Sequence, residues 1–302
     1  MKLVECVPNF SEGRRPEVLD EIVGAMLAVP GVRLLDREMD PNHNRAVVTI
    51  VGEPEPVLEG AFRGIERAAA VIDLRSHEGE HPRMGAADVV PFVPVRGVTM
   101  EECVSLARRL GERVGRELGI PVYLYECAAT RPDRENLADV RKGQFEGLCR
   151  EVGVNPDRDP DCGPKRIHPS AGAVAIGARA FLVAYNINLG TDDVAVAKAI
   201  ARAIRHSTGG LRYVKAMGFE LKDRGIVQVS INMVNFEGTP LYRVFELVKA
   251  EAARHGVPIV GSEIVGLVPE DALIACAEFY LRLEGFKRDQ ILEYRLSESE
   301  ES

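Results

Sequence analysis

The chain has 302 residues, of which 46% are hydrophobic and 28% charged, and its formal net charge is −8. This composition is that of a globular protein with about two domains, and the acidic balance excludes a general nucleic-acid-binding surface, which needs a basic face. No apolar run reaches the roughly 20 residues that cross a bilayer, residues 1–10 lack a signal-peptide core, and the six cysteines form no C-x-x-C pair. We therefore expect a cytoplasmic protein without nucleic-acid or membrane partners.

Hydrophobic periodicity predicts the order β-α-β-β-α-β for the first part of the chain. Strands are expected at residues 2–7, 32–38, 45–52 and 89–95, and helices after Pro16 and over residues 53–72. A further helix is expected at residues 99–118, because Thr99 and Glu102 form a capping box ahead of apolar residues at helical spacing. One more strand is expected at residues 121–125.

The same order recurs in the second part of the chain. Strands are expected at residues 181–189, 212–221, 225–236 and 258–268, and helices over residues 191–205 and after Pro240. Two copies of one βαββαβ topology predict an α/β (α+β) fold with two similar subdomains. We place the first at residues 1–178, including a linker, and the second at residues 179–302.

Residues 130–172 form a long polar connection, in which we expect one short helix around residues 137–148. A connection of this length is usually functional or a domain linker. Residues 163–179 are rich in glycine and other small residues, which is typical of a flexible linker but would also let a flat ligand approach the backbone. Lys165 and Arg166 could neutralise a carboxylate there, and the segment does not match a P-loop.

Residues 77–81 read HEGEH and match the H-E-x-x-H zinc-protease pattern, which requires two histidines on one face of a helix. Gly79 weakens a helix by roughly 1 kcal/mol, and Pro82 pushes His81 toward extended geometry. In an extended chain His77 and His81 lie about 13 Å apart, too far to share one ion. The motif therefore indicates a loop, either a solvated one or one whose histidine moves protons near neutral pH.

Two predicted strands carry uncharged polar side chains at alternate positions. Gln228, Ser230 and Asn232 alternate with apolar residues in one strand, and Asn186 and Asn188 do so in the other. Such a face is compatible with plain solvent exposure. It also suits a cavity that hydrogen-bonds a polar heterocycle without burying charge. If both halves present such a face, a ligand cleft is expected between them.

Five stretches resemble signatures of the glutamate formimidoyltransferase family, the formiminotransferase domain of histidine breakdown, and they span nearly the whole chain. They read ECVPNFSEGR, GEHPRMGAADVVPFVPVRGV, PVYLYECAA, GARAFLVAYNINL and PIVGSEIVGLVP. The resemblance implies two α/β subdomains whose sheets face each other across a tunnel that holds tetrahydrofolate. It also implies transfer of the formimino group from N-formimino-L-glutamate to N5 of this co-substrate, giving 5-formiminotetrahydrofolate and L-glutamate, with no metal.

The same resemblance implies roles for particular residues. It places the catalytic histidine, a general acid/base, on His81 and an orienting carboxylate on Glu38. Arg45 and Lys165 are candidate partners for substrate carboxylates, and His77 has no assigned role. The folate-binding segment falls on Gly163, Pro164, Lys165, Arg166, Ile167, His168, Pro169, Ser170, Ala171 and Gly172.

The sequence leaves several alternatives open. His168 and Ala171 stand where mammalian members have an apolar residue and a tryptophan, so the segment's role carries over better than its individual contacts. A glycine formimidoyltransferase of purine fermentation, with formiminoglycine as donor, would share all the folate features. A folate-binding protein without turnover and a metal-dependent hydrolase are rivals of other classes. We expect no cyclodeaminase domain of the kind that larger family members carry, and the paired sheets leave room for a homodimer.

Overall fold

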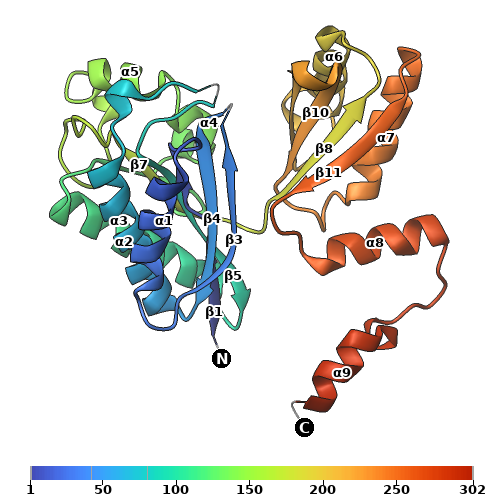
Figure 1. Ribbon diagram of the computed structural model, residues 1–302, viewed down its shortest axis with the longest axis horizontal. Coiled ribbons are helices and arrows are strands. Elements are labelled where there is room, and N and C mark those ends of the chain that lie inside the picture. The colour runs from blue at the N-terminus through green and yellow to red at the C-terminus, as the bar shows by residue number, and fades with distance from the viewer. Residues whose placement is uncertain (1, 42, 80, 301–302) are drawn as a thin grey trace. The chain divides into compact units, whose positions relative to one another are not determined.

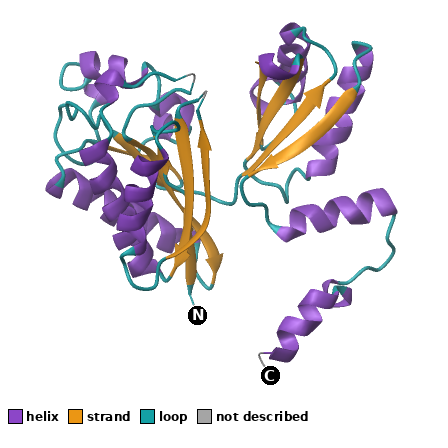
Figure 2. Ribbon diagram, viewed as in Figure 1, coloured by secondary structure: helices purple, strands orange, loops and turns teal. Residues whose placement is uncertain are grey.

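The computed structural model describes residues 2–41, 43–79 and 81–300, and it divides into two compact units, Met1–Ala180 and Phe181–Ser302 (Figure 1). Each unit has its own β-sheet with helices packed on it (Figure 2). This organisation confirms the predicted α/β class with two subdomains. No helix in the described part of the chain is long and apolar enough to cross a membrane.

The first unit holds the longer series of elements. They are β1 (Leu3–Cys6), β2 (Asn9–Phe10), α1 (Pro16–Leu27), β3 (Arg33–Asp40), β4 (Arg45–Gly52), α2 (Pro54–Val71), β5 (Ala87–Arg96), α3 (Met100–Glu117), β6 (Val122–Glu126), α4 (Leu137–Val140), α5 (Gln144–Glu151) and β7 (Val174–Ala178). The expected βαββαβ order is present here, with β1 and β2 in the place of its first strand.

The sheet of this unit has seven strands in the order β1-β4-β2-β5-β7-β6, with β3 beside β4. The strands from β1 to β5 pair antiparallel, whereas β7 pairs parallel with both β5 and β6. Helices α1, α2 and α3 pack on one face of the sheet. The core beneath them includes Phe10, Met26, Ile50, Ile65 and Phe92.

Two expectations for this unit were wrong. Val174–Ala178 is not part of a flexible linker, because it forms β7 and all five of its residues are buried. Residues 130–162 are not a linker either, and they contain two short helices, α4 and α5, instead of one. They cover the second face of the sheet, where Leu148 packs with Tyr123 and Tyr125 in a smaller core.

The second unit has the simpler sheet. Its elements are β8 (Val183–Leu189), α6 (Val194–Ile204), β9 (Val214–Leu221), β10 (Ile226–Met233), α7 (Leu241–Arg254), β11 (Ile259–Val265), α8 (Glu270–Leu281) and α9 (Leu292–Glu300). The four strands are antiparallel in the order β11-β8-β10-β9, which confirms the predicted βαββαβ topology. Helices α6 and α7 pack on the apolar face, over Ile187, Val229 and Val244. Helices α8 and α9 were not predicted.

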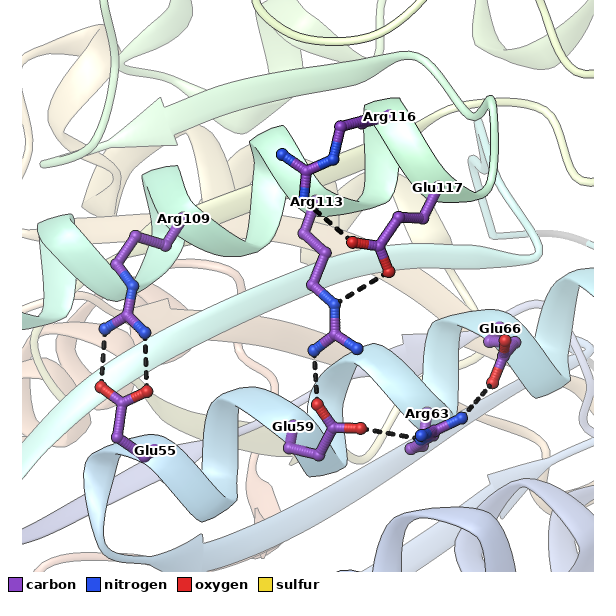
Figure 3. Close-up of polar contacts among 8 residues, drawn as sticks. All are labelled: Glu55, Glu59, Arg63, Glu66, Arg109, Arg113, Arg116 and Glu117. Carbon is purple, nitrogen blue, oxygen red and sulfur yellow. Dashed lines mark hydrogen bonds and ion pairs between the residues drawn. The ribbon is translucent and has the colours of Figure 1, made fainter.

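Ion pairs join α2 to α3 in the first unit (Figure 3). Arg109 binds both carboxylate oxygens of Glu55 at 2.6 Å, and Arg113 pairs with Glu59. Exposed pairs of this kind contribute about 0–1 kcal/mol each. The guanidinium of Arg113 also lies 3.7 Å from the centre of the Phe62 ring, so packing as well as charge holds the two helices together.

A close backbone contact joins the loop before β5 to the segment before β7. Ala86 N–H donates to Ala171 O, and Ala173 N–H donates to Met84 O, both at 2.9 Å. Gly85 lies inside this contact, and a Cβ there would be 1.8 Å from Ala173 O. Only glycine fits at position 85 without moving one of the two backbones.

We predict that Gly85→Ala destabilises the protein by about 3 kcal/mol or more, because the methyl group overlaps a buried carbonyl. Gly24→Ala is the matched control, since Gly24 lies in α1 and a Cβ there meets no atom within 4 Å. The control should raise stability by about 0.5–1 kcal/mol. Urea unfolding of the two variants measures both effects, and equal stability of the Gly85 variant and the wild type would contradict the prediction.

Candidate active site

The HEGEH motif lies in a loop between a 3₁₀ turn at Leu74–Ser76 and β5. Its described residues, 77–79 and 81, are not helical, which confirms the predicted loop, and Glu80 lies outside the described residues. His77 Nε2–H donates to Asn44 O at 2.9 Å, and His77 Nδ1 accepts from Arg83 Nε at 3.3 Å. Both ring nitrogens of His77 are therefore used to hold the loop in place.

His81 contacts the guanidinium of Arg45, the first residue of β4. Arg45 Nη1 lies 2.6 Å from His81 Nε2. A guanidinium can only donate hydrogen bonds, so Nε2 must accept this one and the imidazole proton must lie on Nδ1. The contact therefore fixes both the tautomer and the neutral state of His81.

The surroundings of His81 disfavour its protonated form. The pKa of His81 falls from 6.5 to about 2, mainly because burial penalises the imidazolium and then because Arg45 and Arg141 add positive charge. His43 lowers this pKa further, and its ring centre lies 6.1 Å from that of His81. Burial and Arg141 also lower the pKa of Arg45, so the positive charges share a confined site.

This cationic environment is a poor one for a metal ion. In the described ranges, which omit Glu80 of the motif, no group of three or more His, Cys, Asp or Glu side chains could hold a metal. The expected absence of a metal from the reaction stays a prediction.

A buried ion pair joins Asp88 of β5 to Arg141, which lies just after α4. Asp88 also binds the backbone of Met84, in the loop that carries His81. Asp88 is 1% exposed, and its Oδ1 accepts the Met84 N–H at 2.7 Å. Its Oδ2 pairs with Arg141 Nη2. Arg141 Nε is buried and has no hydrogen-bond partner among the described residues, so this arginine retains a donor. Breaking a buried pair of this kind by removing one partner typically costs about 3–5 kcal/mol.

Sequence reasoning missed both members of this pair. Asp88 and Arg141 are 53 positions apart, and no local pattern connects a strand aspartate to an arginine in a polar connection. The one sequence signal for Arg141 was the length of the connection at residues 130–172, because a connection this long is usually functional or a domain linker.

Glu38 lies on the same face of β3 as Asp40. The strand register pairs Asp40 with Arg45 and Glu38 with Val47, so both carboxylates point to the side of the sheet on which Arg45 lies. Each of them raises the pKa of Arg45, against the effect of burial. Glu38 is thus connected electrostatically to the arginine that contacts His81, and a direct orienting role for Glu38 stays a prediction.

The two ends of the predicted folate segment, residues 163–172, lie in different parts of the first unit. Gly163 packs against the end of α3, where a Cβ would lie 2.8 Å from Ile120 O. Lys165 is exposed and pairs with Asp159 at 2.7 Å. Arg166 and Pro169 are also exposed, and Pro164 and Ile167 are partly buried.

The end of the segment lies against the loop that carries His81. His168 and Gly172 form a tight turn through two backbone hydrogen bonds, and His168 Nδ1 accepts the Ala171 N–H at 3.0 Å. Ser170 O accepts the Leu74 N–H at 2.9 Å, just before the HEGEH motif. The structure therefore brings residues 168–172 to the His81 loop, and it places Gly163 in the packing of α3.

A buried carboxyl group on β1 was also missed by sequence reasoning. Glu5 is 7% exposed and faces away from helices α1, α2 and α3, together with Val51 and Val93. Burial raises its pKa from 4.5 to about 7, and the nearby Arg179 partly opposes this shift. Glu5 therefore titrates close to neutral pH, well above the usual range of a carboxyl group.

Comparison with known proteins identifies the family of the chain. Residues 3–179 match the model of the formiminotransferase domain, N-terminal subdomain, and residues 184–294 match that of the formiminotransferase domain. The chain is 53% identical to the glutamate formimidoyltransferase of Streptococcus pyogenes serotype M1, over 98% of this chain and 99% of that protein. It is also 53% identical to the glutamate formimidoyltransferase of Thermoplasma acidophilum, over 99% of both chains.

The two-unit α/β fold and these matches define a one-carbon group transferase. The chain belongs to the formiminotransferase family. It is 47% identical to the formimidoyltransferase-cyclodeaminase of Mus musculus, and that match covers 92% of this chain and 52% of the mouse protein.

We predict that Arg45→Gln raises the pKa of His81 above its value of about 2, because it removes the nearest positive charge. Burial, the larger cause of the low pKa, remains, so the pKa should stay below 6.5. The ring chemical shifts of His81, followed by NMR as pH is lowered, measure this change. Arg109→Gln is the matched control, since Arg109 of α3 is an exposed arginine that pairs with Glu55 of α2. An unchanged His81 titration in the Arg45 variant would contradict the assigned contact.

We predict that Glu5→Gln removes a loss of stability that the wild type undergoes as pH rises from about 4.5 through about 7. The pKa of Glu5 is about 7 in the folded protein, above its ordinary value of 4.5. Between these two pH values the folded state holds a proton that the unfolded state has released, and the stability that depends on this proton is lost as pH rises through about 7. Relative to the variant, the wild type should lose about 3 kcal/mol of stability between pH 4.5 and pH 9. Unfolding at several pH values measures the difference. Glu112→Gln, at an exposed position of α3, should show none, and parallel profiles for both variants would contradict the assignment.

Proposed function

We propose that His81 is the general acid/base of the formimino transfer that this chain catalyses. The chain is a one-carbon group transferase of histidine degradation. It transfers the formimino group from N-formimino-L-glutamate to N5 of tetrahydrofolate, which yields 5-formiminotetrahydrofolate and L-glutamate. The observation that carries the proposal is the 2.6 Å contact between Arg45 Nη1 and His81 Nε2, which keeps the imidazole neutral.

The reaction needs two proton transfers. N5 of the folate attacks the amidine carbon of the donor, and N5 loses a proton as a tetrahedral intermediate forms. When this intermediate collapses, the bond to the glutamate nitrogen breaks and that nitrogen gains a proton. A single neutral histidine can accept the first proton and donate the second, and holding both substrates together supplies much of the rate.

We propose that the donor itself activates His81. With a pKa of about 2 in the free protein, His81 is too weak a base to take a proton from N5. A carboxylate of N-formimino-L-glutamate can bind Arg45 and Arg141, since both guanidinium groups favour carboxylates. The negative charge then compensates the two arginines, and the pKa of His81 rises toward the range in which it can exchange protons. Binding of the donor would thus precede formation of the competent base.

We propose that residues 163–172 bind tetrahydrofolate and that Glu38 contributes to the orientation of His81 through Arg45. The tight turn at residues 168–172 supports the first role, because it lies against the loop that carries His81. The exposed charges of Lys165 and Arg166 suit the carboxylates of the folate tail. The electrostatic link between Glu38 and Arg45 supports the second role.

We further propose that the chain forms a homodimer through α8 and acts in the cytoplasm. Helix α8 packs on α7 and still leaves large apolar side chains exposed, with Leu273 at 45%, Phe279 at 48% and Leu281 at 68%. A helix this apolar is normally buried on most sides, and a second copy would cover it. The six unpaired cysteines favour a reducing compartment.

We predict that the metal-stripped protein releases glutamate from N-formimino-L-glutamate only when tetrahydrofolate is present. His81→Ala should lower kcat by about 100-fold or more, which is the usual contribution of a general acid/base. His255→Ala, at an exposed position after α7, is the matched control and should retain full activity. Release without folate that disappears on chelation would contradict the proposed function and would favour a metal-dependent hydrolase.

A further inference from the structure

A second histidine lies beside His81, on the turn between β3 and β4. The ring centre of His43 is 6.1 Å from that of His81, and the two rings are inclined at 64° to each other. The side chain of His43 is 33% exposed, so substrates can reach it from solvent. The first unit therefore presents two imidazole rings at one place.

Asp40 of β3 orients the ring of His43. His43 Nδ1–H donates to Asp40 Oδ2 at 3.0 Å, and the backbone N–H of His43 donates to Asp40 Oδ1 at 2.9 Å. Because Nδ1 carries the proton of this hydrogen bond, Nε2 is the ring nitrogen that exchanges protons. An imidazole held by a carboxylate is the arrangement of acid/base groups in many enzymes that transfer acyl groups.

The turn that carries His43 is fixed to the loop that carries His81. Asn44 Nδ2 donates to Glu78 O at 2.9 Å. The backbone of Gly79 packs against that of His43, and a Cβ at this glycine would lie 2.4 Å from His43 O. The two rings are thus held at a defined separation by their backbones.

His81 has only one ring nitrogen to offer to the substrates. Its Nε2 contacts Arg45, and its Nδ1–H is held by the backbone of Pro82, which has a carbonyl and no N–H. The two proton transfers of the reaction occur at different nitrogens of one tetrahedral carbon. An acid/base group must lie about 3 Å from the nitrogen it serves, so two rings that flank one such carbon have centres roughly 6–9 Å apart. The separation of His43 and His81 fits this requirement.

The two histidines have opposite electrostatic surroundings. His81 lies among arginines, whose charge opposes protonation of its ring. His43 lies against the carboxylate of Asp40, and a carboxylate at hydrogen-bond distance stabilises an imidazolium. Such a difference in surroundings is typical of a pair in which one group is the base and the other is the acid.

We infer that His43 is a second catalytic residue, the general acid that protonates the leaving glutamate nitrogen, and that Asp40 is its positioning residue. The inference rests on the proposed function, in which His81 accepts the proton of N5. When the bond from carbon to the glutamate nitrogen breaks, its electron pair stays on nitrogen, which takes the proton of His43 Nε2. Transfer of a proton from His81 to His43 through one water molecule then restores both rings.

The test is the turnover of N-formimino-L-glutamate and tetrahydrofolate by the full-length His43→Ala variant. Its kcat should fall about tenfold or more, and the KM for each substrate should change by less than about twofold. Imidazole added to the buffer should restore part of this kcat, because it can supply the missing proton. His206→Ala, at an exposed position of the second unit, is the matched control and should show neither loss nor rescue.

Asp40→Asn tests the positioning role, because it removes the carboxylate charge and keeps the size of the side chain. It should lower kcat about threefold or more by itself and cause no further loss in a His43→Ala background, since the two residues act as a unit.

A His43→Ala variant with unchanged kcat, or one whose lost kcat imidazole does not restore, would overturn the inference. Additive losses from Asp40→Asn and His43→Ala would overturn the positioning role of Asp40. These outcomes leave the proposed function intact as long as the wild type transfers the formimino group and His81→Ala does not. A wild type without any transfer would instead refute the proposed function.

Discussion

The contact between Arg45 and His81 is the interaction on which the proposed chemistry of the first unit depends. It holds the imidazole neutral, because the guanidinium can only donate and Nε2 must accept. Burial and a second arginine, Arg141, deepen this effect until the pKa of His81 reaches about 2. At this pKa the imidazole is too weak a base to take a proton near neutral pH. Our proposal is that a carboxylate of the donor compensates the arginines and so makes His81 an effective acid/base.

The contact between Arg45 and His81 depends on how the loop that carries His81 is held in place. The loop that carries His81 is fixed at one side by His77 on Asn44 O. It is fixed at the other side by the hydrogen bonds between Met84–Ala86 and residues 171–173, where Gly85 leaves no room for a side chain. Residues 130–162 close the second face of the sheet and supply Arg141. The loop that carries His81 is thus part of the packed structure of the unit.

The sequence was sufficient to predict the repeated βαββαβ order, because most strands and helices have clear periodicity and turn signals. Strand β7 was missed because Val174–Ala178 is buried on both faces, so its small residues show no alternation and resemble a glycine-rich linker. The HEGEH loop was predicted correctly from Gly79 and Pro82, whose backbone preferences are local. The pair of Asp88 and Arg141 could not be predicted, because it depends on tertiary contact over 53 positions.

The central claim is that the donor raises the pKa of His81 by compensating Arg45 and Arg141. The most direct measurement is the NMR titration of His81 with and without saturating N-formimino-L-glutamate, in the absence of folate so that no transfer occurs. The account predicts that the free protein keeps His81 neutral down to at least about pH 4, and that the donor moves its pKa toward 6.5. A His81 that titrates near 6.5 in the free protein, or whose pKa does not respond to the donor, would contradict it.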